Sequence, residues 1–330
     1  MLVQTCRFLN KYLQYLCYNL DMSNETTIKN IIICGLGAIG SIYAYKISNC
    51  SNFDLRILVD NDRLKKYEKT PVIFNNEPLK LKYILPEDTN FKADLVIIST
   101  KYNGLKSAIK NLRNFVGENT IVLSLLNGIT SEKIIAEEFG DDKILYSYFI
   151  GHSAVRKGNK TTQDGVNTIV FGHPNKNNRN VIKVKNFFDV TGINYEIPED
   201  IIHSMWLKFL LNVSSNQTSA VLNLTFGDMQ NNPMCMKFIK NIAKEVTEIA
   251  KAEGVKGTET FEKEYDRAFL SMSPDGKTSM LQDVLAKRKT EVEIFAQTVI
   301  ELGKKHNIQT PYNLVLKEMI DIIEWRNNAI

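Results

Sequence analysis

A lysine and two asparagines recur at four-residue intervals in the second half of the chain: Lys208, Asn212 and Asn216. In an α-helix, residues at this spacing lie on one face, and most of the positions around them are apolar. A solvent-exposed face is the ordinary explanation, but asparagine is a weak helix former and a poor choice for such a face. The pattern therefore favours the polar wall of a binding cleft, made of one cation and two amides.

A glycine-rich turn near the start of the chain is a second candidate site. It follows the apolar run 31–34 at once, and another apolar run, 55–59, ends at Asp60. Strand, glycine turn, helix, strand and acid, in this order, are typical of a dinucleotide-binding βαβ unit, in which helix N–H groups face the pyrophosphate. A glycine turn without a ligand is the alternative. The residues predicted to bind the dinucleotide are Gly35, Leu36, Gly37, Ala38, Ile39 and Gly40.

The elements that must position these residues change in kind along the chain. Apolar runs indicate buried strands at 31–34, 55–59, 94–99, 120–125 and 144–150, and 161–172 is also β-like. Helices are expected from 41 to 48, from 105 to 115 and from 131, whereas the polar stretch after Asp60 is expected to form short strands and loops. Alternating strands and helices predict an α/β fold, with a doubly wound parallel sheet of Rossmann type.

From about residue 200 the strand-like runs vanish and helical spacing takes over. Helices are predicted at 201–222, 234–253, 258–269, 291–305 and 312–325. The expected organisation is an extension outside the fold (1–27), a dinucleotide-binding domain (28–199) and an all-helical substrate and catalytic domain (200–330). A targeting or docking role is the alternative for residues 1–27. A helical second domain can also supply the surface of a homodimer.

Two further strand ends of the predicted sheet carry polar residues. Ligands of open parallel sheets lie beyond the carboxyl ends of the strands, where Lys101 follows one run and Asn127 another. Lys101 either reaches a cofactor phosphate or the nicotinamide, or is a solvated loop lysine. Asn127, followed by Gly128, either forms a plain turn or fixes the nicotinamide or the substrate.

Composition excludes several classes of partner. The 330 residues carry a net charge of +4, with Lys and Arg scattered, which does not suggest a nucleic-acid surface. No run reaches the roughly 18 apolar residues of a membrane helix. Five cysteines without a CxxC motif indicate reduced thiols in the cytoplasm, and the four histidines lack metal-ligand spacing. The expected partner is a small molecule.

These motifs, in this order, resemble the ketopantoate reductases (2-dehydropantoate 2-reductases). The resemblance runs from Ile28 to the last predicted helix and implies a fold and an activity. Family members reduce the ketone of the 2-keto acid ketopantoate to pantoate, for pantothenate biosynthesis, with a nicotinamide cofactor. The segments that carry the resemblance are 35–40, 99–101, 126–128, 206–208 with Asn212 and Asn216, 279–283 and 290–291.

The resemblance also implies a role for each matching residue. The catalytic pair would be Lys208 and Glu291, and the substrate-binding residues would be Asn127, Asn212, Asn216 and Ser279. Asp60, Lys101 and Asn127 would join the glycine turn in binding the cofactor. From the residues alone, Ser279 is instead expected to cap a helix and Glu291 to lie in a first helical turn.

The chain departs from the family pattern at three positions. Gln217 stands where a proline is usual, and Phe226 precedes Gly227 where an asparagine is usual. These two changes leave a different small 2-keto acid open as the substrate. A non-catalytic dinucleotide-sensing protein is the alternative of another class, although a sensor has no need of a proton donor such as Lys208.

The third departure concerns the cofactor. Asp60 stands where NADPH-preferring members often have an arginine, and a carboxylate suits the ribose hydroxyls of NADH. Arg63, Lys65 and Lys66 lie just beyond and can still meet the phosphate of NADPH. The resemblance implies NADPH, and Asp60 makes NADH the alternative.

Overall fold

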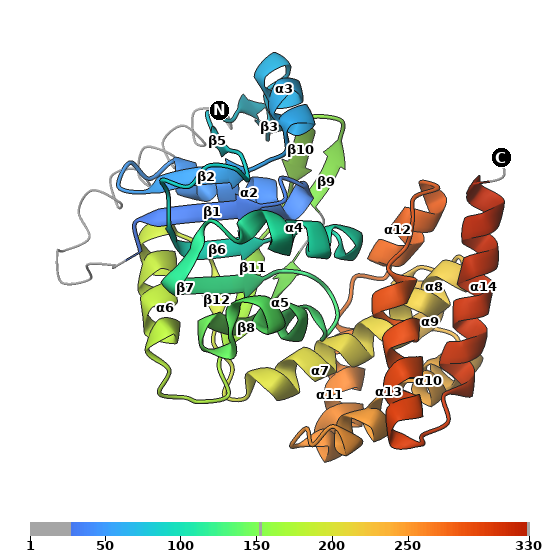
Figure 1. Ribbon diagram of the computed structural model, residues 1–330. Coiled ribbons are helices and arrows are strands. Elements are labelled where there is room, and N and C mark those ends of the chain that lie inside the picture. The colour runs from blue at the N-terminus through green and yellow to red at the C-terminus, as the bar shows by residue number, and fades with distance from the viewer. Residues whose placement is uncertain (1–27, 152–153, 329–330) are drawn as a thin grey trace, which may run out of the picture. The chain divides into compact units, whose positions relative to one another are not determined.

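The computed structural model describes residues 28–151 and 154–328 (Figure 1). The extension predicted at 1–27 lies outside the described residues. Contacts divide the chain into two compact units. The first unit ends at Ile201 but gives up Asn127–Thr130 to the second unit, which continues from Ile202.

The first unit is built on an eight-stranded sheet with the order β12-β11-β8-β7-β6-β1-β2-β5. β1 pairs in parallel with both β2 and β6, so the strand order reverses at the centre of the sheet. The predicted α/β class is confirmed, with one difference: β11 runs antiparallel to β8. The strands are β1 (Asn30–Cys34), β2 (Asp54–Leu58), β5 (Lys82–Ile84), β6 (Ala93–Ile98), β7 (Val116–Ser124), β8 (Ile144–Gly151), β11 (Asn167–Gly172) and β12 (Tyr195–Glu196).

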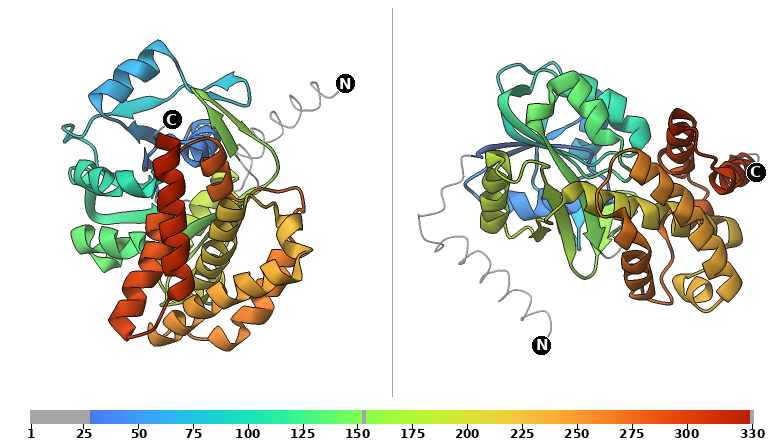
Figure 2. Two further views of the ribbon diagram at one scale, coloured as in Figure 1. Left: turned by 90° about the vertical axis from the view of Figure 1, so that its right-hand side faces the viewer. Right: turned by 90° about the horizontal axis from the view of Figure 1, so that it is seen from below.

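Helices cover both faces of this sheet because successive strand residues point to opposite sides. Ile31 and Ile33 belong to a buried cluster with α2 and α6, whereas Ile32 belongs to a second cluster with α4 and α5. Figure 2 shows the two layers of helices on either side of the strands. The helices are α2 (Ala38–Ser48), α4 (Leu105–Leu112), α5 (Ser131–Phe139) and α6 (Arg179–Thr191).

The polar stretch after Asp60 is only partly as expected. Its first part forms α3 (Asn61–Lys69), a strongly polar helix without a buried residue, in which only Leu64 and Tyr67 pack against the core. The short strands expected next do occur, in a separate sheet with the order β4-β3-β10-β9. β3 (Ile73–Phe74) and β4 (Glu77–Pro78) come from the polar stretch, β9 (Ala154–Lys157) and β10 (Lys160–Gln163) come from later in the chain, and the third short strand of the stretch, β5, joins the main sheet instead.

All regular secondary structure among the described residues of the second unit is helical, and loops join the helices. The single helix predicted at 201–222 is wrong in one respect, because a π-helical turn, Asn212–Asn216, separates α7 from α8. α13 and α14 lie side by side (Figure 2). The helices are α7 (Ile201–Leu211), α8 (Gln217–Leu222), α9 (Phe226–Gln230), α10 (Pro233–Ala252), α11 (Phe261–Leu270), α12 (Ser279–Leu285), α13 (Ala296–His306) and α14 (Pro311–Asn328).

Candidate active site

The glycine turn brings β1 and α2 closer together than side chains would allow. Gly35 has a φ of +102°, and a Cβ placed there would lie 2.7 Å from the Thr100 backbone nitrogen. A Cβ on Gly40 would lie 1.9 Å from the Gly35 carbonyl oxygen. Only glycine fits at these two positions, as the dinucleotide-binding motif requires.

Gly37 differs from its neighbours because a Cβ placed there would have nothing within 4 Å. It is the N-cap of α2 and has no side-chain hydrogen bond, and no acidic residue stands in the first turn of that helix. Leu36 before it is buried, and Ala38 and Ile39 after it are half-buried. An open backbone at a helix N-terminus without a competing carboxylate fits the pyrophosphate of a dinucleotide.

The end of the neighbouring strand β6 completes this edge of the sheet. The Ser99 hydroxyl donates a hydrogen bond of 2.6 Å to the Gly35 carbonyl and so ties the two strand ends together. The Thr100 hydroxyl oxygen is buried without a hydrogen-bond partner among the described residues. Lys101 follows as an exposed residue that precedes a 3₁₀ turn, Tyr102–Gly104. A bound ligand would meet polar groups from two adjacent strands here.

Asp60 has a structural role at the start of α3. Its side chain accepts a hydrogen bond of 2.7 Å from the Arg63 backbone N–H and caps the helix. The Arg63 guanidinium also lies 3.7 Å from the carboxylate, and both side chains are more than half exposed. The negative charge of the Asp60 carboxylate is therefore accompanied by the positive charge of the Arg63 guanidinium.

Arg156 on β9 is a site residue that the sequence analysis does not single out. Its guanidinium donates to the Leu36 carbonyl in the glycine turn and lies 3.3 Å from the Ser41 hydroxyl. The contact joins positions 120 residues apart. No pattern in the local sequence indicates it, because the pairing depends on how the small sheet packs against α2.

The second unit gathers the two residues implied to be catalytic around Asn127. The Lys208 ammonium on α7 donates to the Asn127 side-chain oxygen at 3.2 Å. The Asn127 amide nitrogen donates to the Glu291 carboxylate at 2.8 Å. Asn127 is 81 residues from Lys208 and 164 from Glu291, so one amide joins a cation and an anion from distant segments.

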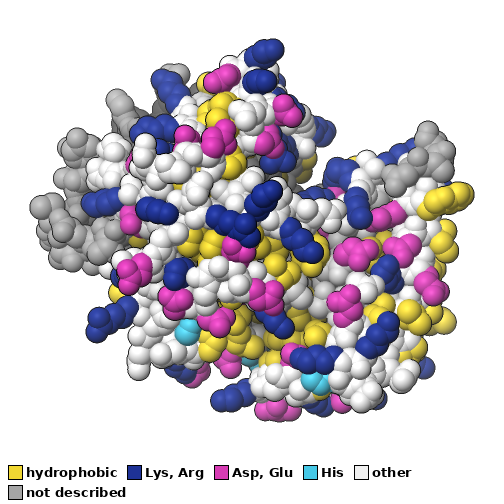
Figure 3. All heavy atoms as spheres, in the orientation of Figure 1, with side chains coloured by type: hydrophobic (Ala, Val, Ile, Leu, Met, Phe, Trp, Pro, Cys, Tyr) yellow, Lys and Arg dark blue, Asp and Glu magenta, His cyan; other side chains and the backbone are white. Residues whose placement is uncertain are grey.

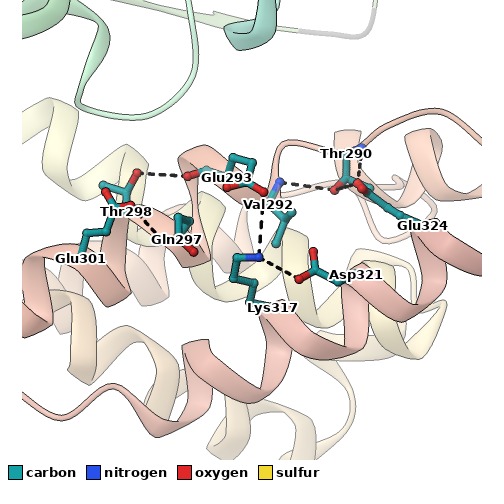
Figure 4. A network of polar contacts seen from close by, with 9 residues as sticks. All are labelled: Thr290, Val292, Glu293, Gln297, Thr298, Glu301, Lys317, Asp321 and Glu324. Atoms are coloured by element: carbon teal, nitrogen blue, oxygen red, sulfur yellow. Dashed lines mark hydrogen bonds and ion pairs between the residues drawn. The ribbon is translucent and has the colours of Figure 1, made fainter.

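The segment around Glu291 is fixed by contacts with α14 (Figure 4). The expectation that Glu291 lies in a first helical turn is wrong, because Glu291 directly precedes the 3₁₀ turn Val292–Ile294. The backbone N–H and the hydroxyl of Thr290 both donate to the Glu324 carboxylate, at 2.7 and 2.6 Å. Lys317 lies 3.9 Å from the Glu293 carboxylate on the other side. These contacts hold the backbone that carries Glu291.

Asn212, Asn216 and Ser279 form a second polar group in the same unit. The Asn216 amide nitrogen lies 3.4 Å from both the Asn212 side-chain oxygen and the Ser279 hydroxyl. Asn216 is only 6% exposed, which excludes a solvent-facing stripe. The expectation that Ser279 caps α12 is wrong, because Thr278 is the N-cap and accepts the Leu281 N–H. The Ser279 side chain is thereby left to face Asn216.

The described residues thus offer two kinds of chemistry. The first unit has a backbone cradle for a phosphate, and the second unit has an ammonium, a carboxylate and several amides. Within residues 28–151 and 154–328, no three His, Cys, Asp or Glu side chains gather so that they could hold a metal ion. No helix in those ranges is long and apolar enough to cross a membrane. An α/β unit with a dinucleotide-binding motif, followed by a helical unit that carries a lysine and a glutamate, is the arrangement expected of a two-domain, nicotinamide-dependent oxidoreductase.

Comparison with known families agrees with this description. The family described as "Ketopantoate reductase PanE/ApbA" matches residues 31–176, and its C-terminal part, "Ketopantoate reductase PanE/ApbA C terminal", matches residues 200–324. The chain belongs to the ketopantoate reductase family, as the resemblance predicts.

Curated relatives match over nearly their whole length. A protein of Pyrococcus abyssi named 2-dehydropantoate 2-reductase is 30% identical over 298 residues, which cover 88% of this chain and 96% of that protein. One of Streptococcus pyogenes with the same name is 27% identical over 297 residues, with the same coverage. The similarity therefore includes both units of the chain.

Solved structures show the same fold at lower sequence identity. D-mandelate dehydrogenase in a ternary structure with NADH and anilino(oxo)acetate has a TM-score of 0.80 and 21% identity, over 91% of this chain and 99% of that one. A ketopantoate reductase from Staphylococcus aureus, described as dimeric, has a TM-score of 0.70 and 19% identity, over 90% of this chain and 99% of that one.

Proposed function

We propose that this protein is an NAD(P)H-dependent 2-dehydropantoate 2-reductase that reduces ketopantoate to pantoate in pantothenate biosynthesis. The observation that carries the proposal is the arrangement of Lys208 and Glu291 on either side of Asn127. Membership of the ketopantoate reductase family and the shared name of the relatives from Pyrococcus abyssi and Streptococcus pyogenes support it.

The side chains of the second unit match the needs of ketone reduction. A bound reduced nicotinamide supplies the hydride. A hydride that reaches a ketone carbon leaves negative charge on the oxygen, and an ammonium in hydrogen-bond reach stabilises that charge and donates the proton. Lys208 has this role in our proposal, since lysine side chains are ordinarily protonated at neutral pH. Asn127 orients the ammonium, and Glu291 accepts a hydrogen bond from a substrate hydroxyl.

The second polar group is suited to a substrate carboxylate. The amides of Asn212 and Asn216 and the hydroxyl of Ser279 are donors that a carboxylate can accept from. We assign them to substrate binding for this reason.

A reductase of another small 2-keto acid is the second candidate, and it rests on the departures at Phe226 and Gln217. The backbone N–H of Phe226 still hydrogen-bonds to the Gly276 carbonyl, and that of Gly227 to the Pro274 carbonyl. The turn is therefore pinned to its neighbours by backbone contacts that do not depend on the side chain at position 226.

We assign the glycine turn, Lys101 and Asn127 to the binding of the dinucleotide, with NADPH as the preferred form. Asp60 is occupied as a helix cap, and Arg63 beside it carries a charge that can meet a 2′-phosphate. NADH stays the alternative because of the same carboxylate, and the related D-mandelate dehydrogenase is described with NADH.

If NADPH is preferred, Arg63→Ala raises the KM for NADPH and leaves the KM for NADH unchanged. Equal KM values for the two cofactors in the wild type would contradict the assignment.

A homodimer through the helical unit is part of the proposal. Large apolar side chains on α14 are exposed, and Figure 3 shows yellow side chains along the edge of the molecule that α14 forms. They are Leu314, Val315, Met319, Ile322 and Trp325. The Staphylococcus aureus neighbour is described as dimeric. We also propose a cytoplasmic location, which suits the buried Cys34 and Cys235, neither of which is in a disulfide.

The experiment that tests the function is a spectrophotometric assay of cofactor oxidation against a panel of 2-keto acids. Oxidation with ketopantoate, matched by formation of pantoate, is the expected result. Oxidation only with other keto acids would move the assignment to the second candidate. Cofactor binding without oxidation by any keto acid would indicate a dinucleotide-sensing protein.

A further inference from the structure

The π-turn Asn212–Asn216 is surrounded by side chains that hydrogen-bond to backbone carbonyls four positions earlier. A π-turn moves backbone hydrogen bonds from the fourth to the fifth preceding residue, so carbonyls around it need other donors. The hydroxyls of Ser214, Ser215 and Thr218 act in this way, as does the amide of Gln217. Their acceptors are the carbonyls of Leu210 (2.8 Å), Leu211 (2.5 Å), Ser214 (2.7 Å) and, for Gln217, Val213 (2.8 Å).

Two of these residues also reach other helices: the Ser214 hydroxyl lies 3.2 Å from the Tyr265 hydroxyl on α11, and Gln217 reaches α14. The Gln217 amide nitrogen donates to the side-chain oxygen of Asn313, on α14, at 3.1 Å. The Asn313 amide nitrogen in turn donates to the Glu245 carboxylate, on α10, at 2.7 Å. Gln217 and Asn313 are fully buried. A buried relay of side chains therefore joins the π-turn to two long helices.

Glu245 determines which side-chain atoms of Asn313 and Gln217 act as donors and which as acceptors in this buried set of hydrogen bonds. Its carboxylate also accepts the backbone N–H groups of Tyr312 and Asn313, at 2.8 and 3.1 Å, and so caps α14. A carboxylate that accepts at every contact requires the Asn313 nitrogen to point toward it and the Asn313 oxygen to point toward Gln217. Gln217 must then use both of its N–H bonds, one for Val213 and one for Asn313.

The remaining oxygen of Gln217 is buried without a hydrogen-bond partner among the described residues. Such an unsatisfied polar atom is destabilising. Gln217 nevertheless holds the Val213 carbonyl in place. We therefore attribute the presence of this side chain, despite its cost, to the conformation of the π-turn that it stabilises.

We infer that Gln217 is a positioning residue that holds the π-turn in the form that aims Asn212 and Asn216 at the substrate. The inference rests on the proposed role of these two asparagines. Reversion to α-helical pairing would turn the residues after the π-turn by about 100° relative to those before it. Asn212 and Asn216 would still share a face, but the Asn216 side chain would be rotated away from the Ser279 hydroxyl, which lies 3.4 Å from it here.

Gln217→Met tests the inference because methionine keeps the length of the side chain and removes both donors. The KM for ketopantoate rises about tenfold, kcat changes by less than about threefold, and the affinity for the cofactor is unchanged. Ser219→Ala is the matched control: it removes a buried hydroxyl of the same helix whose acceptor, the Leu224 carbonyl, lies outside the π-turn, and it leaves KM unchanged. A folded Gln217→Met protein with wild-type KM overturns the inference, and so does an equal rise of KM in both variants.

Two further measurements keep the test decisive. If Gln217→Met does not fold, Asn313→Ser releases Gln217 from α14, and the expected rise in KM is about threefold; an unchanged KM overturns the inference. If the wild-type protein reduces no keto acid, the proposed function has failed, but hydrogen exchange still tests the positioning. Amide exchange of residues 212–216 is then faster in Gln217→Met than in Ser219→Ala, and equal rates overturn the inference.

Discussion

The two candidate sites are built on opposite principles. The glycine turn is a continuous segment, and it works through backbone groups and through the absence of side chains at Gly35, Gly37 and Gly40. The site in the second unit is made of side chains from separate segments that meet at Asn127, with Lys208 on one side and Glu291 on the other. The first kind of site is sensitive to added atoms. The second kind is sensitive to lost charges and to movements of the helices that carry them.

The largest effect is expected when the charge at the centre of the second site is removed. Lys208→Ala lowers kcat by about 10³-fold, since no other group replaces the ammonium at the carbonyl oxygen. Cofactor affinity, measured by fluorescence titration, stays at the wild-type value. The control is Lys244→Ala, which removes an exposed lysine of the same unit and leaves both quantities unchanged. Normal turnover by Lys208→Ala would remove the proposed mechanism.

Added atoms are expected to damage the first site in two different ways. Gly40→Ala places a Cβ against the Gly35 carbonyl and lowers the free energy of unfolding by about 1–3 kcal/mol. Gly37→Ala meets no atom in the protein and keeps the wild-type stability, but its methyl group takes space that the pyrophosphate needs. Thermal unfolding and cofactor titration separate the two effects. Equal losses of stability would contradict the account of Gly37 as an open cradle.

A smaller effect is expected from the contacts that hold Glu291. Glu324→Ala removes the carboxylate to which Thr290 donates two hydrogen bonds and lowers kcat about tenfold, because the segment next to Glu291 loses its anchor. Glu318→Ala removes the same charge from an exposed position of α14 and serves as the control. Steady-state kinetics decide: equal kcat values for the two variants would show that this anchor has no part in catalysis.

The smallest effect concerns pH and the relay below the π-turn. Burial raises the pKa of Glu245 above its ordinary value of 4.5, although hydrogen bonds from Asn313 and Tyr312 oppose the shift. The folded protein therefore holds this proton more tightly than the unfolded chain does. The resulting stabilisation is complete below the ordinary pKa and is lost as pH rises through the raised pKa. Denaturant unfolding should show that the free energy of unfolding of the wild type rises relative to that of Glu245→Gln as pH falls through this window. A constant difference would contradict the shift.

Much of the fold could be predicted because its signals are local. Unbroken apolar runs identify the buried strands, and the glycine turn is a motif of six consecutive residues directly after one of them. α3 was missed because it is strongly polar and none of its residues is buried, so that only Leu64 and Tyr67 mark its inner face. The antiparallel pairing of β11 with β8 was missed because strand direction depends on connections, which hydrophobic runs do not encode.

The candidate site could be predicted only in part. The four-residue spacing brought Asn212 and Asn216 together, as the observed contact shows, but it did not reveal the π-turn. The contact of Asn127 with Glu291 spans 164 residues and depends on the packing of the second unit. No local pattern encodes such a contact, so only the resemblance to a family placed Glu291 and Ser279 in the site. The catalytic and binding roles themselves stay predictions.

The most direct test of the account is a crystal structure of the protein with the oxidised cofactor and pantoate bound together. The account predicts that the Lys208 ammonium lies within hydrogen-bond distance of the pantoate hydroxyl that replaces the ketone, with Asn127 still in contact with that ammonium. A complex in which the Lys208 side chain points into solvent, with another group beside that hydroxyl, would contradict it.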